Sequence, residues 1–104
     1  MAIDQKTTIQ SGKQFASLVR AKIDSDAIVL LFGSCAKNKT HDRSDIDIAV
    51  VSKTFGSNVV ENLVNISLLG YSVHPDIEAH AISMKEWEHA TPFINEIKKT
   101  GVAL

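Results

Sequence analysis

The segment from Asp45 to Val51, DIDIAVV, constrains the fold of this chain more than any other. Acidic and aliphatic residues alternate at its start, and it continues as an apolar run. Successive side chains of a strand point to opposite faces, so Ile46 and Ile48 are predicted to face a core. Asp45 and Asp47 then project together from the other face. We expect a central strand whose start is open to a cleft.

Periodicity and end signals predict the other elements of the chain. The expected order is a helix from about Thr8 to Lys22, a strand from Ala27 to Phe32, the strand from Asp45 to Val51, a helix that follows Ser57 and stops at Gly70, a strand from Val73 to Ile82, and one or two short helices that start at Ser83 and Thr91 and end at Gly101. Glycine at Gly70 predicts a left-handed helix end there. The preceding helix is expected to turn Val59, Leu63 and Ile66 toward the core. This order predicts an α/β fold, while the strand directions stay open.

Length and composition limit the classes of protein to which the chain can belong. A chain of 104 residues predicts one domain, 1–104. Its 11 basic and 12 acidic residues give a net charge of -1, so we do not expect nucleic acid as a direct partner. No apolar run approaches the roughly 20 residues of a membrane span. With the single Cys35 and no secretory start, these features predict a cytoplasmic protein.

A phosphate and a metal ion are the ligands that the charged residues predict. Two carboxylates on one strand face, Asp45 and Asp47, repel each other unless a cation lies between them, and their hard oxygens suit Mg²⁺ or Mn²⁺. Gly33 ends a buried strand and lets the backbone approach a ligand, and Ser34 can donate its hydroxyl to phosphate. Each motif taken alone also fits an ordinary turn or a pair of solvated acids.

The segment from Leu31 to Ser52, LFGSCAKNKTHDRSDIDIAVVS, resembles the signature of the polymerase-beta-like nucleotidyltransferases. In that family a Gly-Ser pair precedes Asp-x-Asp, and the gap from Ser34 to Asp45 is that of the minimal, or MNT, branch. Many relatives have a basic residue and then a glycine after the alanine, whereas this chain has Lys37 and then Asn38. The resemblance implies a small polymerase-beta-like fold, with helices packed on a mixed three- to four-stranded sheet.

The same resemblance implies the site and its chemistry. Metal would be held by Asp45, Asp47 and a third carboxylate on the neighbouring strand, for which Glu78 is preferred and Asp76 is the alternative. His80 shares the strand face of Glu78 and can line the cleft. Nucleotide would contact a set of residues around the predicted turn, namely Gly33, Ser34, Lys37 and Arg43. The implied reaction is transfer of AMP from ATP to a hydroxyl, assisted by Mg²⁺ or Mn²⁺.

Two functions remain open from the sequence. Small free-standing MNT proteins resemble antitoxins whose partner is a HEPN-domain ribonuclease, so the resemblance implies adenylylation of a tyrosine on such a toxin. The alternative is a module that neutralises a partner by contact, without catalysis. The oligomeric state stays open.

Two competing motifs are rejected. Gly33 to Thr40, GSCAKNKT, misses the last glycine of a P-loop and leads into a strand instead of a helix. The four histidines have no spacing typical of a zinc site.

Overall fold

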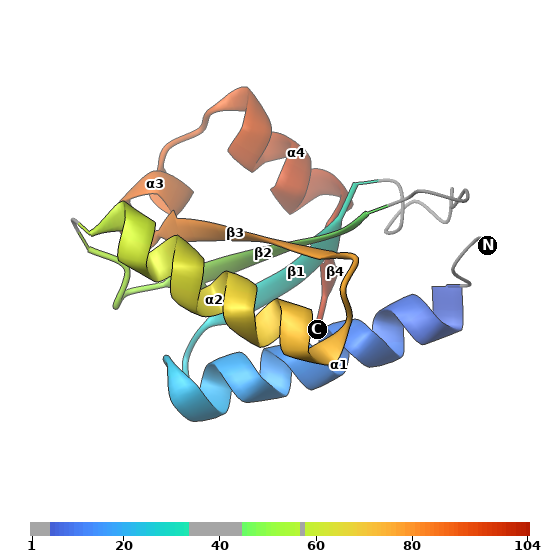
Figure 1. The fold of residues 1–104 in the computed structure, drawn as a ribbon. Helices are drawn as coiled ribbons and strands as arrows, with labels where there is room; N and C mark the ends of the chain where they lie inside the picture. Colours follow the sequence, from blue (N-terminus) through green and yellow to red (C-terminus); the bar gives the residue numbers. More distant parts are fainter. Residues whose placement is uncertain (1–4, 34–44, 57) are drawn as a thin grey trace.

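The computed structural model describes residues 5–33, 45–56 and 58–104, which form helices on both faces of one sheet (Figure 1). The elements in chain order are α1 (Gln5–Lys22), β1 (Ile28–Phe32), β2 (Ile46–Ser52), α2 (Val59–Val73), β3 (Ile77–Ser83), α3 (Met84–Glu88), α4 (Pro92–Thr100) and β4 (Val102–Ala103). The sheet order is β3-β2-β1-β4. β2 is parallel to β3 and antiparallel to β1, and β1 is antiparallel to β4. The predicted α/β fold with a mixed sheet is confirmed.

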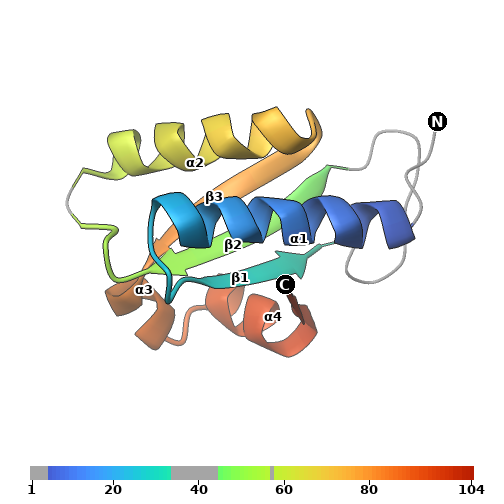
Figure 2. The same ribbon diagram turned by 90° about the horizontal axis from the view of Figure 1, so that it is seen from below.

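Helices form a layer on each side of the sheet (Figure 2). α1 and α2 cover one face, and α3 and α4 cover the other. Between α1, α2 and the sheet lies the larger core, which includes Phe15, Leu31 and Ile66. The smaller core, on the side of α4, includes Ile82 and Ile97. Because strand side chains alternate, β1, β2 and β3 each contribute to both cores.

The alternation predicted for β2 is present. Ile46 and Ile48 are fully buried against α1 and α2. Asp47 lies between them on the opposite face and is partly buried. Farther along that face, Ala49 and Val51 are buried in the smaller core. The start of the strand therefore carries polar groups on the α4 side, and the rest of it is packed on both sides.

The predicted end of α2 at Gly70 is wrong. The helix continues to Val73, and β3 begins at Ile77 instead of Val73. Gly70 is buried within the helix, where a Cβ atom would lie 2.8 Å from Cγ2 of Ile77. The glycine serves close packing of helix on strand, and the sequence alone does not distinguish this role from a helix end.

The prediction that Val59 and Leu63 face the core is also wrong. Ile66 is buried as expected, but the side chains of Val59 and Leu63 are 64% and 44% exposed. This part of α2 lies along β3, which is an edge strand of the sheet in the described part of the chain. Within the described residues no further strand extends the sheet beneath these side chains, and they are exposed to water.

The C-terminal helices begin and end where the sequence predicts. Ser83 and Glu86 form a capping box at the start of α3, and Thr91 accepts a hydrogen bond from the Ile94 N–H at the start of α4. Gly101 follows the last turn of α4. The short strand β4 follows it and was not placed by the sequence, since two residues carry no legible periodicity. Among the described helices, none is both long and apolar enough to cross a membrane.

Candidate active site

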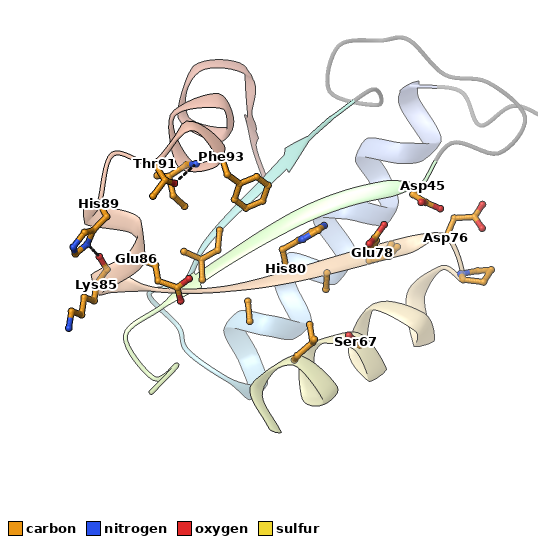
Figure 3. A pocket seen from close by; sticks show the side chains of 17 residues that line it. Asp45, Ser67, Asp76, Glu78, His80, Lys85, Glu86, His89, Thr91 and Phe93 are labelled. Atoms are coloured by element: carbon orange, nitrogen blue, oxygen red, sulfur yellow. Dashed lines mark hydrogen bonds between the residues drawn. The ribbon is translucent and has the colours of Figure 1, made fainter. Parts of the chain in front are cut away.

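Asp47 occupies the middle of the sheet at the start of β2. Its register partners are Phe32 on β1 and Glu78 on β3. Because paired residues in register point to the same face, the side chains of Asp47 and Glu78 project together toward α4. Asp45 lies two residues before Asp47 and is exposed at the same end of the sheet (Figure 3). The pairing of β2 with β3 thus brings together acids that are far apart in the sequence.

A potential metal-ligand set lies at this point of the sheet. One ligand atom each from Asp47, Glu78 and His80 lies within 4.8 Å of the others. His80 Nε2 is 3.4 Å from Oδ1 of Asp47. In Figure 3, Glu78 and His80 extend from the same side of β3. The sequence indicated that His80 shares the face of Glu78, but its contact with Asp47 depends on the strand register.

Like charges raise the energy of the ionised Glu78 carboxyl. Its pKa lies above 4.5, first because the surrounding protein partly shields it from water, and second because the Asp47 charge is close. Asp45 acts in the same direction through its charge and a hydrogen bond, whereas His80 lowers the pKa. A divalent cation among these groups would remove the repulsion.

Gly33 brings the end of β1 against Asp47. Its φ of +76° is rarely adopted by L-residues, and a Cβ atom there would lie 2.7 Å from Oδ2 of Asp47. The sequence predicted that Gly33 lets the backbone approach a ligand. In the structure, the absence of a side chain makes room for the carboxylate of Asp47.

Aromatic rings form one wall beside the acids. The His80 ring contacts Phe32 edge-on with centroids 5.1 Å apart, and Phe93 of α4 lies 5.7 Å from Phe32 and 6.1 Å from His80. Phe93 is 48% exposed, although aromatic side chains usually bury most of their surface. Its place beside His80 exposes an aromatic surface next to the acid cluster.

Of the remaining predicted site residues, the structure describes only Asp76. Asp76 lies in the turn before β3, is exposed, and donates its backbone N–H to Nδ1 of His74 at 3.0 Å. It is not in the ligand set that Glu78 joins. The others lie outside the described residues, namely Ser34, Lys37 and Arg43. Their roles stay predictions.

A cavity of about 940 Å³ opens beside the acids and runs along β3. Asp45, Asp76, Glu78 and His80 line one end of it. Its walls come from α2 on one side and from α3 and α4 on the other (Figure 3). Ligand pockets in proteins commonly have volumes of roughly 300 to 1,000 Å³, so the cavity is large enough to hold a ligand.

The donor chemistry fits a hard divalent cation. Carboxylate oxygens from two strands can converge on one ion, and oxygen ligands are those that Mg²⁺ and Mn²⁺ prefer. The imidazole of His80 is compatible with Mn²⁺ as a direct ligand, or it can orient Asp47 from outside the ligand set. The structure therefore supports a candidate acidic metal site at the start of β2 and β3.

The fold and the acids define an α/β domain with a candidate metal site at the start of its central strand. The chain belongs to the family described as polymerase beta, nucleotidyltransferase, whose sequence profile matches residues 17–104. The resemblance stated from the sequence is thereby confirmed.

Comparison with solved structures gives a second match. A chain in a crystal structure described as a mutant of the toxin-antitoxin MntA-HpeT is similar in fold, with a TM-score of 0.59. The match covers 97% of this chain and 72% of that chain at 17% sequence identity, a level at which the likeness concerns the fold alone. No curated protein sequence matches the chain.

Proposed function

We propose that this protein is a metal-dependent nucleotidyltransferase that moves AMP from ATP to a hydroxyl acceptor. We further propose that the acceptor is a tyrosine of a HEPN-domain toxin, and that the protein acts as its antitoxin. Family membership supports nucleotidyl transfer, and the fold neighbour named as a toxin-antitoxin supports the biological role. The observation that carries the proposal is the convergence of Asp47, Glu78 and His80 within 4.8 Å, with Asp45 beside them.

The residues of the site have distinct roles in this proposal. Asp45, Asp47 and Glu78 would hold Mg²⁺ or Mn²⁺, which supplies screening of the phosphate charge and stabilises the departing pyrophosphate. His80 keeps the Asp47 carboxylate in position. The exposed ring of Phe93 provides a surface on which a base or an aromatic acceptor can pack.

The reaction exchanges one phosphorus-oxygen bond for another. The acceptor oxygen bonds to the α-phosphorus while the bond from that phosphorus to the oxygen bridging the β-phosphate breaks, so pyrophosphate leaves. The hydroxyl proton passes to a carboxylate of the site and then to water. Glu78 is the candidate for this proton because it lies on the edge strand beside the cavity.

Calorimetric titration with ATP and GTP, in Mg²⁺ and then in EDTA, tests the nucleotide site. We expect metal-dependent binding that is lost in the Asp45→Asn, Asp47→Asn variant. Asp26→Asn is the matched control, because this exposed acid lies at the other end of the sheet and pairs with Lys53. Absence of nucleotide binding by the folded wild-type protein would overturn the proposal.

A contact-only module is the second candidate, and a specific observation favours it. α2 exposes a row of large apolar side chains on one helix face, namely Val60, Val64, Leu68 and Tyr71. Such a row commonly marks a protein interface. Neutralisation of a co-expressed toxin by the Asp45→Asn, Asp47→Asn variant would favour this candidate, and loss of neutralisation with partner binding retained would favour catalysis.

A further inference from the structure

The outer edge of β3 has unpaired backbone groups. β3 pairs with β2 on one side, and no other strand of the described chain pairs with it. The Ile46 N–H donates a hydrogen bond to the Asp76 carbonyl at 2.8 Å. This bond determines which residues of β3 direct their backbone groups toward β2. In a parallel pair, alternate residues direct both backbone groups to the same neighbour. Glu78 therefore bonds toward β2, whereas Ala79 and Ala81 direct their N–H and C=O groups outward.

The cavity already described lies along this open edge. Every residue of β3 from Ile77 to Ile82 lines it, with Leu63 and Ser67 of α2 on one side and Thr91 and Phe93 on the other (Figure 3). Ala79 is 6% exposed and Ala81 is partly buried, and both line the cavity. A strand adds to a sheet at a spacing of roughly 4.8 Å, and its backbone would satisfy the outward groups. The edge is a template for one extended segment in a groove.

A single segment fits this groove better than a second copy of the chain. β3 is flanked by helices on both sheet faces, and a second copy would bring its own flanking helices to the same edge. Charge also selects the occupant. The groove is lined by four carboxylates and one lysine, namely Asp45, Asp76, Glu78, Glu86 and Lys85. A segment with neutral or basic residues is therefore favoured.

The groove leads an added strand to the acids. Side chains of an added strand alternate between the two faces of the sheet. One that lies beside Glu78 and His80 on the α4 face would sit next to the exposed ring of Phe93, and its neighbours in sequence would point toward Ser67 of α2. An aromatic side chain that carries a hydroxyl can pack on Phe93 and present its oxygen near Glu78.

We infer that the acceptor reaches the site as an extended, neutral or basic polypeptide segment that adds to the open edge of β3 between α2 and α4, with its tyrosine beside Phe93 and Glu78. This inference rests on the proposed function for the transfer step. Docking at β3 can be measured without transfer.

The test uses a short blocked peptide of alternating valine and threonine, with a lysine at each end and a tyrosine at its centre. Binding is followed by amide NMR of the Asp45→Asn, Asp47→Asn variant without nucleotide, and transfer is followed with the wild-type protein and ATP labelled at the α-phosphate. We expect the peptide to shift the amide signals of Ala79 and Ala81.

Two N-methylated isomers of the peptide test the backbone hydrogen bonds. In one isomer the tyrosine and every second residue from it are N-methylated, and in the other the residues between them are. Each isomer therefore has one of the two edges of the peptide blocked. One isomer should bind roughly tenfold or more weakly, because it loses backbone hydrogen bonds, and the other should bind as the parent does.

A protein variant tests the groove independently. Ser67→Trp places a bulky side chain in the groove, and Asn65→Trp is the control on the same helix, because Asn65 is exposed and does not line the cavity. We expect Ser67→Trp to reduce peptide transfer by about tenfold with unchanged ATP binding, and Asn65→Trp to leave both unchanged.

The outcomes separate the inference from the proposed function. Docking at β3 without transfer would count against the proposed function and leave the docking surface standing. The inference is overturned if transfer occurs but the amide signals of Ala79 and Ala81 do not shift, or if both N-methylated isomers are equally active. The proposed enzymatic function would then be unaffected. The inference is also overturned by no shift at millimolar peptide, or by a dimer that already protects the β3 amides.

Discussion

Carboxylates lie at both ends of β2, and the protein treats them in opposite ways. Near Ser52, the Asp24 carboxylate accepts hydrogen bonds from the Ser52 hydroxyl at 2.7 Å and from the Asp26 N–H at 2.9 Å. The pKa of Asp24 is lowered, first by the Asp26 N–H and then by Ser52. Near Asp47, the pKa of Glu78 is raised by partial shielding from water and by negative neighbours.

The difference separates a structural carboxylate from a candidate functional one. Donors of the protein itself stabilise the charge at the Asp24 end, so that end needs no ligand. At the Asp47 end the acids face one another, and a cation from solution would stabilise them. The ends differ in their hydrogen-bond donors and in their charged neighbours, which include Lys53 near Asp24 and Asp47 near Glu78.

The largest expected effect comes from Asp47→Asn. A metal site supplies several kcal/mol of charge stabilisation in the transition state, so transfer should fall by roughly 100-fold or more. Without metal, the variant should be as stable as the wild-type protein or more stable, because repulsion with Glu78 is relieved. Transfer assays and urea denaturation in EDTA measure the two effects. A clear loss of stability in EDTA would contradict the inference that Asp47 and Glu78 repel each other in the absence of metal.

Ser52→Ala should affect the opposite end and leave the site intact. Ser52 is buried and donates to the charged Asp24, so its loss should lower the free energy of unfolding by about 1.5 to 3 kcal/mol. ATP binding by the folded variant should be unchanged. Ser25→Ala is the control, because Ser25 is exposed at the same end and should change stability by less than about 0.5 kcal/mol. Equal effects of the two variants in urea denaturation would count against the Asp24 network.

Gly33→Ala should weaken the site more than the fold. The left-handed backbone at φ +76° costs a substituted residue about 1 to 2 kcal/mol, and the new Cβ atom must displace the Asp47 carboxylate. We expect metal-dependent ATP binding to fall more steeply than stability, as measured by calorimetry and urea denaturation. Gly56→Ala is the matched control, because a Cβ atom there meets nothing within 4 Å. Normal ATP binding by Gly33→Ala would remove Gly33 from the site.

The smallest expected effects are opposite dependences of stability on pH in EDTA. Glu78 binds its proton more tightly in the folded state, so its contribution is present below pH 4.5 and is lost as the pH rises through its raised folded pKa. Asp24 binds its proton less tightly in the folded state, so its contribution is present above pH 3.8 and is lost as the pH falls through its lowered folded pKa.

Urea denaturation over a pH series can separate the two carboxyls. Glu78→Gln should remove the decrease in the free energy of unfolding that occurs above pH 4.5. Asp24→Asn should remove the decrease that occurs as the pH falls below 3.8. If Glu78→Gln left the upper decline unchanged, the raised pKa would belong to another group.

Local patterns predicted more of the fold than did features that depend on tertiary packing. The alternation at the start of β2 placed Asp47 and Ile48 on opposite faces, as they are in the structure. The end of α2 was misread because Gly70 serves packing against Ile77. The sequence did not predict that Val59 is exposed, because its exposure depends on the position of β3 at the edge of the sheet.

The sequence named Asp45, Asp47 and Glu78 as candidate site residues, and their roles stay predictions. The structure places Asp47 and Glu78 side by side in register, with Asp45 just before β2. The contact of His80 with Asp47 and the approach of Gly33 to the same carboxylate depend on how three strands align, which no local pattern specifies.

The parallel pairing of β2 with β3 affects the order of events when the chain folds. Asp45 and Asp47 lie on one strand, but Glu78 joins them only after the crossover through α2 has closed. Nonlocal pairings of this kind form late, because the entropy of loop closure is lost before the contacts form. If the acids bind Mg²⁺ as proposed, the ion should slow unfolding and leave the refolding rate nearly unchanged in stopped-flow experiments. The ion would thus act on the lifetime of the folded protein and not on the speed with which it forms.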